Sequence, residues 1–197
     1  MDIWEIDSNG FVEWIEKSNE DRLYSVNSEG KRSSSYITVN NRSILDAFAG
    51  KKNGAHFSSY SDINDMITVF KFAADNSNVE WAFHRGQDDM YTLVTSHNTD
   101  GVDRYNDLTG RNELPIASVH SHPNQETSFY NEVYTMGYYG GTYPNDYELL
   151  RQGRSPAYNY VYFPKSMNLY NVSLYSPVFI KRIRNPKSFY FGTLNHK

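Results

Sequence analysis

The sequence predicts an α+β fold with an α/β sandwich-like architecture, in which a mixed sheet is flanked by helices. One segment has the apolar spacing of an amphipathic helix, and several short segments rich in β-branched and aromatic residues surround it. The length of 197 residues suits one sizeable core with a small additional lobe. In such a fold we expect a functional site at strand ends, where loops begin.

The first part of the chain is predicted to be a β-hairpin extension. The segments IWEID and FVEWIE flank the turn Ser8-Asn9-Gly10, and RLYSV and SYITV flank the turn Asn27-Ser28-Glu29-Gly30. The stretch from Gly50 to Gly54 contains only Gly, Lys and Asn, which indicates a soft boundary. We therefore divide the chain into an extension over 1–50 and a main domain over 51–197.

The main domain is predicted to begin with a helix that buries one face. Ser61 or Asp62 is a plausible N-cap, Asp75-Asn76 the stop, and the apolar positions between them have helical spacing: Ile63, Met66, Ile67, Phe70, Ala73 and Ala74. Further elements follow in the order VEWAFHRG and MYTLVTS as a hairpin, a strand ending in His120, an aromatic Gly-rich stretch, a helical pattern at YELLRQG, and strands near YNYVYF, LYNVSLY and VFIKRI.

Composition limits the chemistry that is available. A hydrophobic fraction of 39% with 16% aromatic residues predicts a folded protein, and no apolar stretch is long enough to span a membrane. The N-terminus MDIWEIDSNG has acids where a secretory signal has bases, so we expect no signal peptide in this chain. The absence of cysteine excludes disulfides, thiol catalysis and cysteine-ligated zinc. His, Asp and Glu are left as possible metal ligands.

Charge is distributed unevenly around a net value of -4. All 23 acidic residues precede residue 151, whereas the last 47 residues contain 8 Lys and Arg and no acid, with a cluster at Lys181, Arg182, Arg184 and Lys187. Such a surface can attract an acidic partner or nucleic acid, or it can be a solvated face balanced by the acidic remainder. We favour the solvated face and expect no nucleic-acid partner, because no nucleic-acid motif accompanies the charge.

The stretch IASVHSHPN contains the residues that most directly indicate chemistry. In a strand, alternate side chains share a face, so His120 and His122 project together while Ser121 points away. Pro123 cannot continue a strand ladder, which places the pair where strand gives way to loop. Two imidazoles so placed can converge on one metal ion. The alternative is a pair of strand-end histidines satisfied by ordinary hydrogen bonds.

A hydrolytic zinc site needs a third protein ligand, an open position for water and a nearby carboxylate. Asp146 is the only aspartate after His122, so it is the candidate third ligand, although it could equally be the N-cap of the YELL helix. Glu80 begins the strand after the amphipathic helix and is the candidate general base; its alternative is an exposed strand carboxylate. We interpret His84 and His97 as structural.

These residues resemble the motif of the JAB/MPN (JAMM) zinc metallopeptidase family, which has a Glu after the first helix, then His-x-His-Pro, then Ser-x-x-Asp. The corresponding residues are Glu80, His120, His122 and Asp146. The predicted element order also resembles the family's, which implies a cytidine-deaminase-like core. The segments FKFAADNSNVEW and IASVHSHPN, with the opening IWEIDSNGFVEWIEKSNEDRLYSV, resemble the JAB-like toxin domain at the C-terminus of bacterial Rhs-type polymorphic toxins.

The resemblance implies a function. It implies a Zn²⁺-dependent metallopeptidase or isopeptidase that hydrolyses a peptide or a ubiquitin-like linkage. It also implies a toxin module that is secreted as part of a larger toxin or delivered to a target cell, with a protein or peptide substrate and an immunity protein as partners. We expect the chain to act as a monomer.

Two positions depart from the family pattern. Asp146 lies 24 residues beyond His122, farther than in the family, which implies an inserted loop. The family serine, which helps to hold the oxyanion, would fall at Tyr143, with Thr142 beside it. A hydroxyl from either residue could replace it only within about 3 Å of the developing charge. The stretch 129–143 is either a lid over a substrate cleft or ordinary surface aromatics.

Two other functions compete with a JAB-type peptidase. A catalytically inactive JAB-fold interaction module is suggested by the missing serine and the stretched spacing. A different His-x-His hydrolase, such as an amidohydrolase barrel, usually needs about 250 residues and more histidines. Only His196 follows His122, so we disfavour the barrel.

Overall fold

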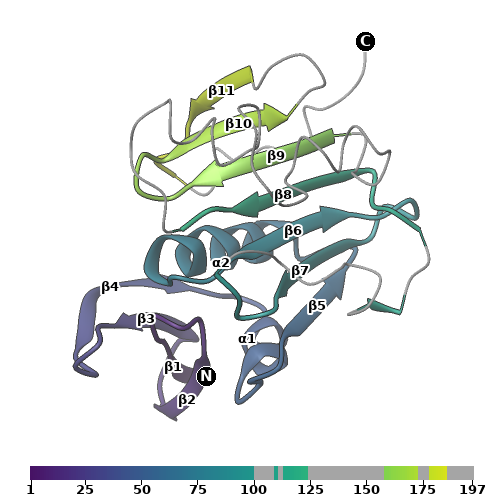
Figure 1. The fold of residues 1–197 in the computed structure, drawn as a ribbon. Coiled ribbons are helices and arrows are strands. Elements are labelled where there is room, and N and C mark those ends of the chain that lie inside the picture. Colours follow the sequence, from purple (N-terminus) through teal and green to yellow (C-terminus); the bar gives the residue numbers. More distant parts are fainter. Residues whose placement is uncertain (100–108, 111–112, 124–157, 173–177, 186–197) are drawn as a thin grey trace.

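A computed structural model describes residues 1–99, 109–110, 113–123, 158–172 and 178–185 (Figure 1). This part of the chain forms a mixed α/β structure with two β-sheets and few helices. None of the helices in the described ranges combines the length and the apolar content needed to cross a membrane.

The smaller sheet is built from the first four strands: β1 (Asp2–Ile6), β2 (Val12–Lys17), β3 (Arg22–Val26) and β4 (Arg32–Thr38). β1 and β2 pair antiparallel, as do β3 and β4, at the places where the sequence predicts hairpins. A parallel pairing of β1 with β3 joins the two hairpins in the order β2-β1-β3-β4.

The larger sheet has seven strands: β5 (Ala55–Ser59), β6 (Trp81–Arg85), β7 (Tyr91–Thr95), β8 (Ala117–Ser121), β9 (Tyr158–Phe163), β10 (Asn168–Val172) and β11 (Val178–Arg182). Their order is β11-β10-β9-β8-β6-β7-β5. β8 and β9 are parallel and all other neighbours are antiparallel, so the sheet is mixed.

In the described ranges, helices α1 and α2 lie between strands in the sequence. Helix α2 (Ile63–Asn76) follows Asp62 and ends before Ser77, close to the predicted bounds. Helix α1 (Ser43–Phe48) and strand β5 were not predicted from the sequence. The reason is physical: six residues are too few to display helical periodicity, and β5, AHFSS, is a largely polar edge strand.

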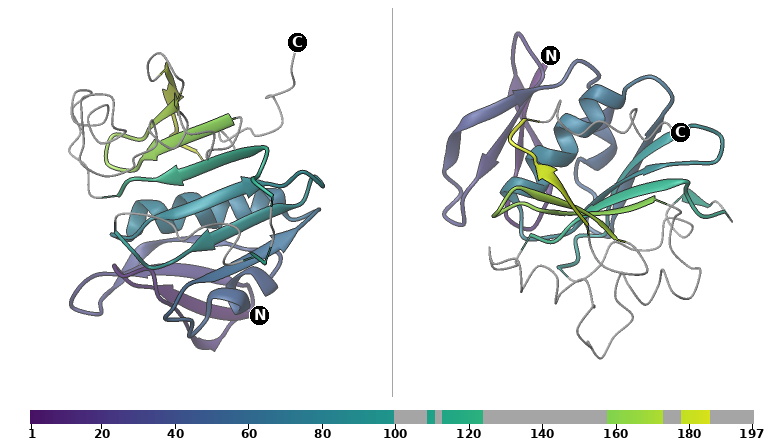
Figure 2. Two further views of the ribbon diagram at one scale, coloured as in Figure 1. Left: turned by 45° about the vertical axis from the view of Figure 1, so that its right-hand side comes forward. Right: turned by 90° about the horizontal axis from the view of Figure 1, so that it is seen from above.

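One hydrophobic core connects the two sheets. Trp4 and Leu23 of the small sheet belong to the same buried cluster as Phe70 of α2 and Trp81 of β6. Seen from above, α2 and the small sheet lie on the same side of the large sheet (Figure 2). The ring of Phe48 in α1 lies 5.0 Å from that of Trp81, centroid to centroid. The domain boundary at residue 50 stays a prediction, but residues on both sides of it share this core.

Candidate metal centre

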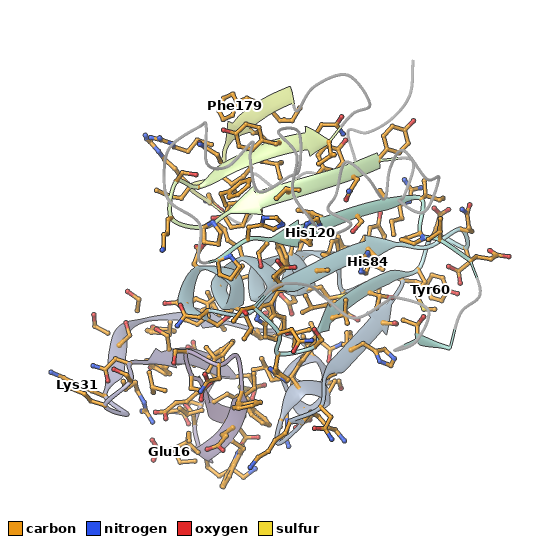
Figure 3. All side chains as sticks on the ribbon, in the orientation of Figure 1. Glu16, Lys31, Tyr60, His84, His120 and Phe179 are labelled. Atoms are coloured by element: carbon orange, nitrogen blue, oxygen red, sulfur yellow. The ribbon has the colours of Figure 1, made fainter. Side chains whose placement is uncertain are left out.

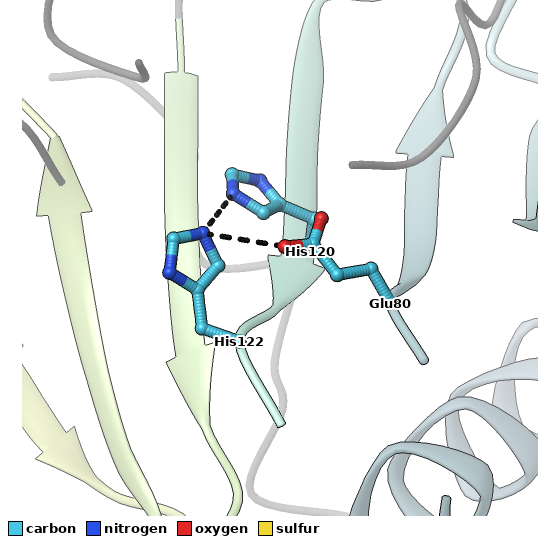
Figure 4. A group of neighbouring side chains, drawn as sticks. All are labelled: Glu80, His120 and His122. Carbon is cyan, nitrogen blue, oxygen red and sulfur yellow. Dashed lines mark hydrogen bonds and ion pairs between the residues drawn. The ribbon is translucent and has the colours of Figure 1, made fainter. Parts of the chain in front are cut away.

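The register of two neighbouring strands brings Glu80 and the two histidines together. β6 and β8 are antiparallel, and Ala82 lies opposite His120. Glu80 lies two residues before Ala82 and His122 two residues after His120, so the antiparallel register brings Glu80 opposite His122. Because side chains alternate along a strand, Glu80, His120 and His122 share one face of the sheet. Figure 4 shows the three side chains converging from the ends of the two strands.

The donor atoms are close enough to share one ion. The Nε2 atoms of His120 and His122 lie 3.1 Å apart, and His122 Nε2 lies 3.8 Å from Glu80 Oε1. One ligand atom from each of the three residues lies within 4.8 Å of the others. Glu80 is 6% exposed and the His122 side chain 11%, so these two side chains are largely shielded from water, and His120 is half-buried.

The backbone around Glu80 is fixed by three hydrogen bonds. Its N–H donates to the carbonyl of Asn98 at 2.8 Å, and its carbonyl accepts from Thr95 Oγ1 at 2.9 Å. The next residue, Trp81, donates its N–H to Ser121 Oγ at 3.0 Å. The pairing of β6 with β8 ends at Ala82 and His120, so the Ser121 hydroxyl joins the strands beyond the ladder. Glu80 lies one residue before β6, whereas the sequence predicted it at the beginning of the strand VEWAFHRG.

The aromatic ring of Phe163 borders His122. The Phe163 ring of β9 meets the His122 ring edge-on at 5.3 Å between centroids. Phe163 belongs to a second buried apolar cluster, together with Val161, Tyr170 and Val172. The N–H of His122 donates to the carbonyl of Tyr162 at 2.9 Å, which ties the residue to β9 beyond the end of β8. Such an apolar border limits the access of water and strengthens electrostatic interactions at the site.

The donor set fits a metal ion that prefers nitrogen and oxygen ligands. Two nitrogens bound to one tetrahedral zinc at about 2.0–2.1 Å are separated by roughly 3.3 Å, close to the spacing of the two imidazole nitrogens. The carboxylate of Glu80 stands somewhat farther off, at 3.8 Å from His122 Nε2. That distance suits a group that contacts a metal-bound water at least as well as a ligand. Without a metal, the same imidazoles would share one hydrogen bond.

Comparison with known proteins bears on the segment that contains these residues. Residues 58–151 match the sequence model of a family described as JAB-like toxin 1. The match supports a JAB-like toxin domain over this segment. A search of curated proteins and a search of solved structures found no match to the chain. The predicted resemblance to a JAB-like toxin domain is thus confirmed.

The JAB-like toxin match spans every candidate site residue in the sequence. The structure brings Glu80, His120 and His122 together. Asp146, Thr142 and Tyr143 lie outside the described residues, as do the helical pattern YELLRQG and the aromatic stretch 129–143. Their roles, and the role of Glu80 as a base, stay predictions. The support given by Ser121 and Phe163 was not anticipated; the outward direction of Ser121 was predicted, but its partner depends on the strand register.

His84 lies on the same sheet face as the candidate metal centre and is also buried. It stands opposite Ser118 of β8 and Thr92 of β7, two residues along the strand from Ala82. Figure 3 labels His84 and His120 on the neighbouring strands β6 and β8. Burial, and to a smaller degree the neighbouring His120, lower the pKa of His84 to about 3. The imidazole is therefore neutral at pH 7.

His97 lies beside the first hairpin turn. Its Nδ1 is 3.2 Å from the carbonyl of Asn9, and its ring packs on Phe11 at 4.7 Å between centroids. Burial lowers its pKa, although the backbone carbonyls of Asn9 and Lys51 oppose that shift. Neither His84 nor His97 belongs to the group of donors that could share a metal in the described part of the chain.

The low pKa of His84 predicts acid sensitivity of the metal-free protein. Unfolding restores an ordinary pKa near 6.5 to His84. Between pH 6.5 and about 3, His84 is therefore protonated in the unfolded chain and neutral in the folded chain. His84 does not lower the free energy of unfolding well above pH 6.5, and the free energy of unfolding decreases as the pH falls below that value. At pH 5 the loss is about 2 kcal/mol. Urea unfolding with EDTA present, at pH 7 and pH 5, should show a smaller decrease for His84→Gln than for the unaltered protein; equal decreases would contradict the assignment.

Proposed function

We propose that the JAB-like toxin domain is a zinc-dependent metallopeptidase that hydrolyses a peptide or a ubiquitin-like isopeptide bond. The observation that carries the proposal is the pair of facing imidazole nitrogens, 3.1 Å apart, with a buried carboxylate on the same sheet face. The proposal includes a JAB/MPN-type, cytidine-deaminase-like core for the large sheet and α2. It also includes the role of toxin module in a bacterial polymorphic toxin of the Rhs type.

The ligands in this proposal are His120, His122 and Asp146. Two nitrogens and one carboxylate oxygen are a ligand set of hydrolytic zinc enzymes, and three protein ligands leave one position open for water. His120 lies in β8, and His122 follows the end of that strand and is bonded to β9, so the spacing of the two histidines is set before a metal binds. Asp146 follows in the same family segment.

The bound zinc would polarise the scissile carbonyl and lower the pKa of its water toward neutrality. Glu80 takes the proton of the attacking water while the oxygen–carbon bond forms, and passes that proton to the amine nitrogen as the carbon–nitrogen bond breaks. Its fixed backbone keeps the carboxylate on the histidine face throughout. A hydroxyl of Thr142 or Tyr143 donates a hydrogen bond to the oxyanion, in place of the family serine.

The match to a JAB-like toxin family supports the proposed delivery and partners. A toxin module acts after transfer to a target cell, and the producing cell needs an immunity protein that blocks the site. The substrate is a peptide or protein whose extended segment reaches the metal face of the large sheet.

Zinc analysis combined with hydrolysis tests this function. The full chain, loaded with zinc at neutral pH and freed of excess metal, is expected to retain one zinc per chain. It should cleave members of a quenched fluorogenic peptide library or a ubiquitin dimer. EDTA should stop cleavage, and added zinc should restore it, because the metal would activate the attacking water.

The outcome also separates the enzyme from its main competitor. An inactive JAB-fold interaction module is favoured if the chain retains no zinc after loading, or if it retains zinc and cleaves none of the probes. Omission of zinc from an otherwise identical preparation is the matched control for trace proteases, which would cleave equally in both samples.

A further inference from the structure

The two hairpin turns of the small sheet are built alike. In the first, the N–H of Asp7 donates to the carbonyl of Phe11, and the carbonyl of Asp7 accepts the N–H of Gly10. The Asp7 carboxylate accepts hydrogen bonds from the N–H groups of Asn9 and Phe11. In the second turn, Asn27 makes the same four contacts with Gly30, Lys31 and Glu29. Gly10 and Gly30 both have left-handed backbones, with φ of 77° and 75°. Alanine would therefore strain the two turns equally.

The surroundings of the two glycines differ. A Cβ atom on Gly10 would lie 2.5 Å from Val79 Cγ2, 3.3 Å from His97 Nδ1 and 3.5 Å from Trp81 Nε1. A Cβ atom on Gly30 would have nothing within 4 Å. The first turn is thus pressed against the residue that precedes Glu80, and only a glycine fits there.

Further contacts fasten the first turn to the segment that leads into β6. The N–H of Asn78 donates to the carbonyl of Ser8 at 2.7 Å. On the other side of the turn, the carbonyl of Asn9 lies 3.2 Å from His97 Nδ1, and the adjacent Asn98 accepts the N–H of Glu80. The turn therefore holds both backbone segments that fix Glu80.

Val79 cannot easily yield to a larger neighbour. It is 3% exposed, and its β-branched side chain has restricted rotation about χ1. A group added at Gly10 must therefore push the Val79 backbone, and with it Glu80, or displace the turn.

We propose that Gly10 is a positioning residue for Glu80, so that the first hairpin turn sets the distance between the Glu80 carboxylate and the two histidines. Gly10 acts through Val79 and touches none of the reacting groups. The hairpin extension is in this way part of the hydrolytic unit. The inference rests on the proposed role of Glu80 as general base.

The test uses the full chain with the single variants Gly10→Ala, Gly30→Ala and Val79→Ala, and the double variant Gly10→Ala/Val79→Ala. Gly30→Ala is the matched control, because it has the same backbone strain without the contact. Four properties are measured: thermal unfolding, retained zinc, kcat and KM on the best peptide or ubiquitin-dimer probe, and hydrogen exchange of the Glu80 and Trp81 amides. Exchange reports the position of this segment whether or not a probe is cleaved.

Gly10→Ala should speed exchange of the two amides and lower kcat by up to about 100-fold, because small misplacements of a catalytic group are costly. KM and retained zinc should stay within about twofold of the unaltered protein, since the histidines do not move. Gly30→Ala should leave exchange and kcat unchanged. In the Gly10→Ala background, Val79→Ala should slow exchange and raise kcat, because it removes the methyl groups with which the new Cβ collides. Val79→Ala alone should neither slow exchange nor raise kcat.

Two results would overturn the proposal: equal exchange for Gly10→Ala and Gly30→Ala, or no recovery in the double variant. Either can occur while the unaltered protein binds zinc and hydrolyses its probe, so the positioning role can fail while the proposed function holds. The converse also holds, because the exchange pattern can appear in a chain that retains no zinc.

Discussion

Glu80→Gln is expected to retain one zinc per chain and to lose about 10²- to 10⁴-fold in kcat, the usual contribution of a general acid–base group. Glutamine keeps the size and hydrogen-bonding shape of the side chain but cannot accept the proton of the attacking water. The 3.8 Å separation between Glu80 Oε1 and His122 Nε2 underlies the expectation that zinc stays. Zinc content by elemental analysis and initial cleavage rates measured on the same sample provide the check.

Glu13→Gln is a matched control, because Glu13 is an exposed carboxylate on β2. It should change neither zinc content nor kcat. Full activity of Glu80→Gln would exclude Glu80 as the base. Loss of zinc together with activity would instead make Glu80 a metal ligand, and Asp146 would then no longer be needed as the third one.

The elements predicted from the sequence are those with a strong local signal. The two N-terminal hairpins have turn residues at fixed positions, and α2 has a long apolar periodicity, so their existence follows from local chemistry. Helix α1 and strand β5 lack such signals, because they are short and are stabilised by contacts with the rest of the fold. The order of strands in the large sheet is likewise set by long-range packing, which one sequence does not display.

The candidate site could be predicted in part for the same reason. The common direction of His120 and His122 follows from the period of a strand. That Glu80 faces them depends on the register of β6 against β8, which pairs Ala82 with His120. A shift of one residue would turn Glu80 to the opposite face. The position of Glu80 after the amphipathic helix and the family resemblance both pointed to this residue. The bonds of Glu80 to Asn98 and Thr95, and that of Trp81 to Ser121, could be found only in the structure.

The position of the site at the end of a ladder has a chemical reason. Where β6 and β8 stop pairing, side chains of neighbouring strands face a common space and the backbone still holds them in place. Ser121 contributes by bonding to the Trp81 N–H, which would otherwise lack its ladder partner at this point. Replacing a backbone bond by a side-chain bond keeps the strands together at the point where the metal would bind.

His120→Ala and His122→Ala should each abolish retention of zinc and, with it, the stabilisation that zinc gives to the fold. A ligand that binds only the folded chain raises stability with its concentration, by about 4 kcal/mol at 1,000 times its Kd. Thermal unfolding of the unaltered protein should therefore shift upward on addition of zinc, whereas neither variant should respond. Differential scanning calorimetry with and without zinc measures the shift.

His56→Ala is the control for this comparison, because His56 is an exposed histidine on β5 outside the donor group. It should respond to zinc as the unaltered protein does. If His120 and His122 only share a hydrogen bond, zinc should stabilise none of these proteins. His120→Ala and His122→Ala should then each lower the free energy of unfolding by about 1 kcal/mol, with or without metal. The zinc-dependent part of the shift is therefore the quantity that separates a metal centre from a pair of strand-end histidines.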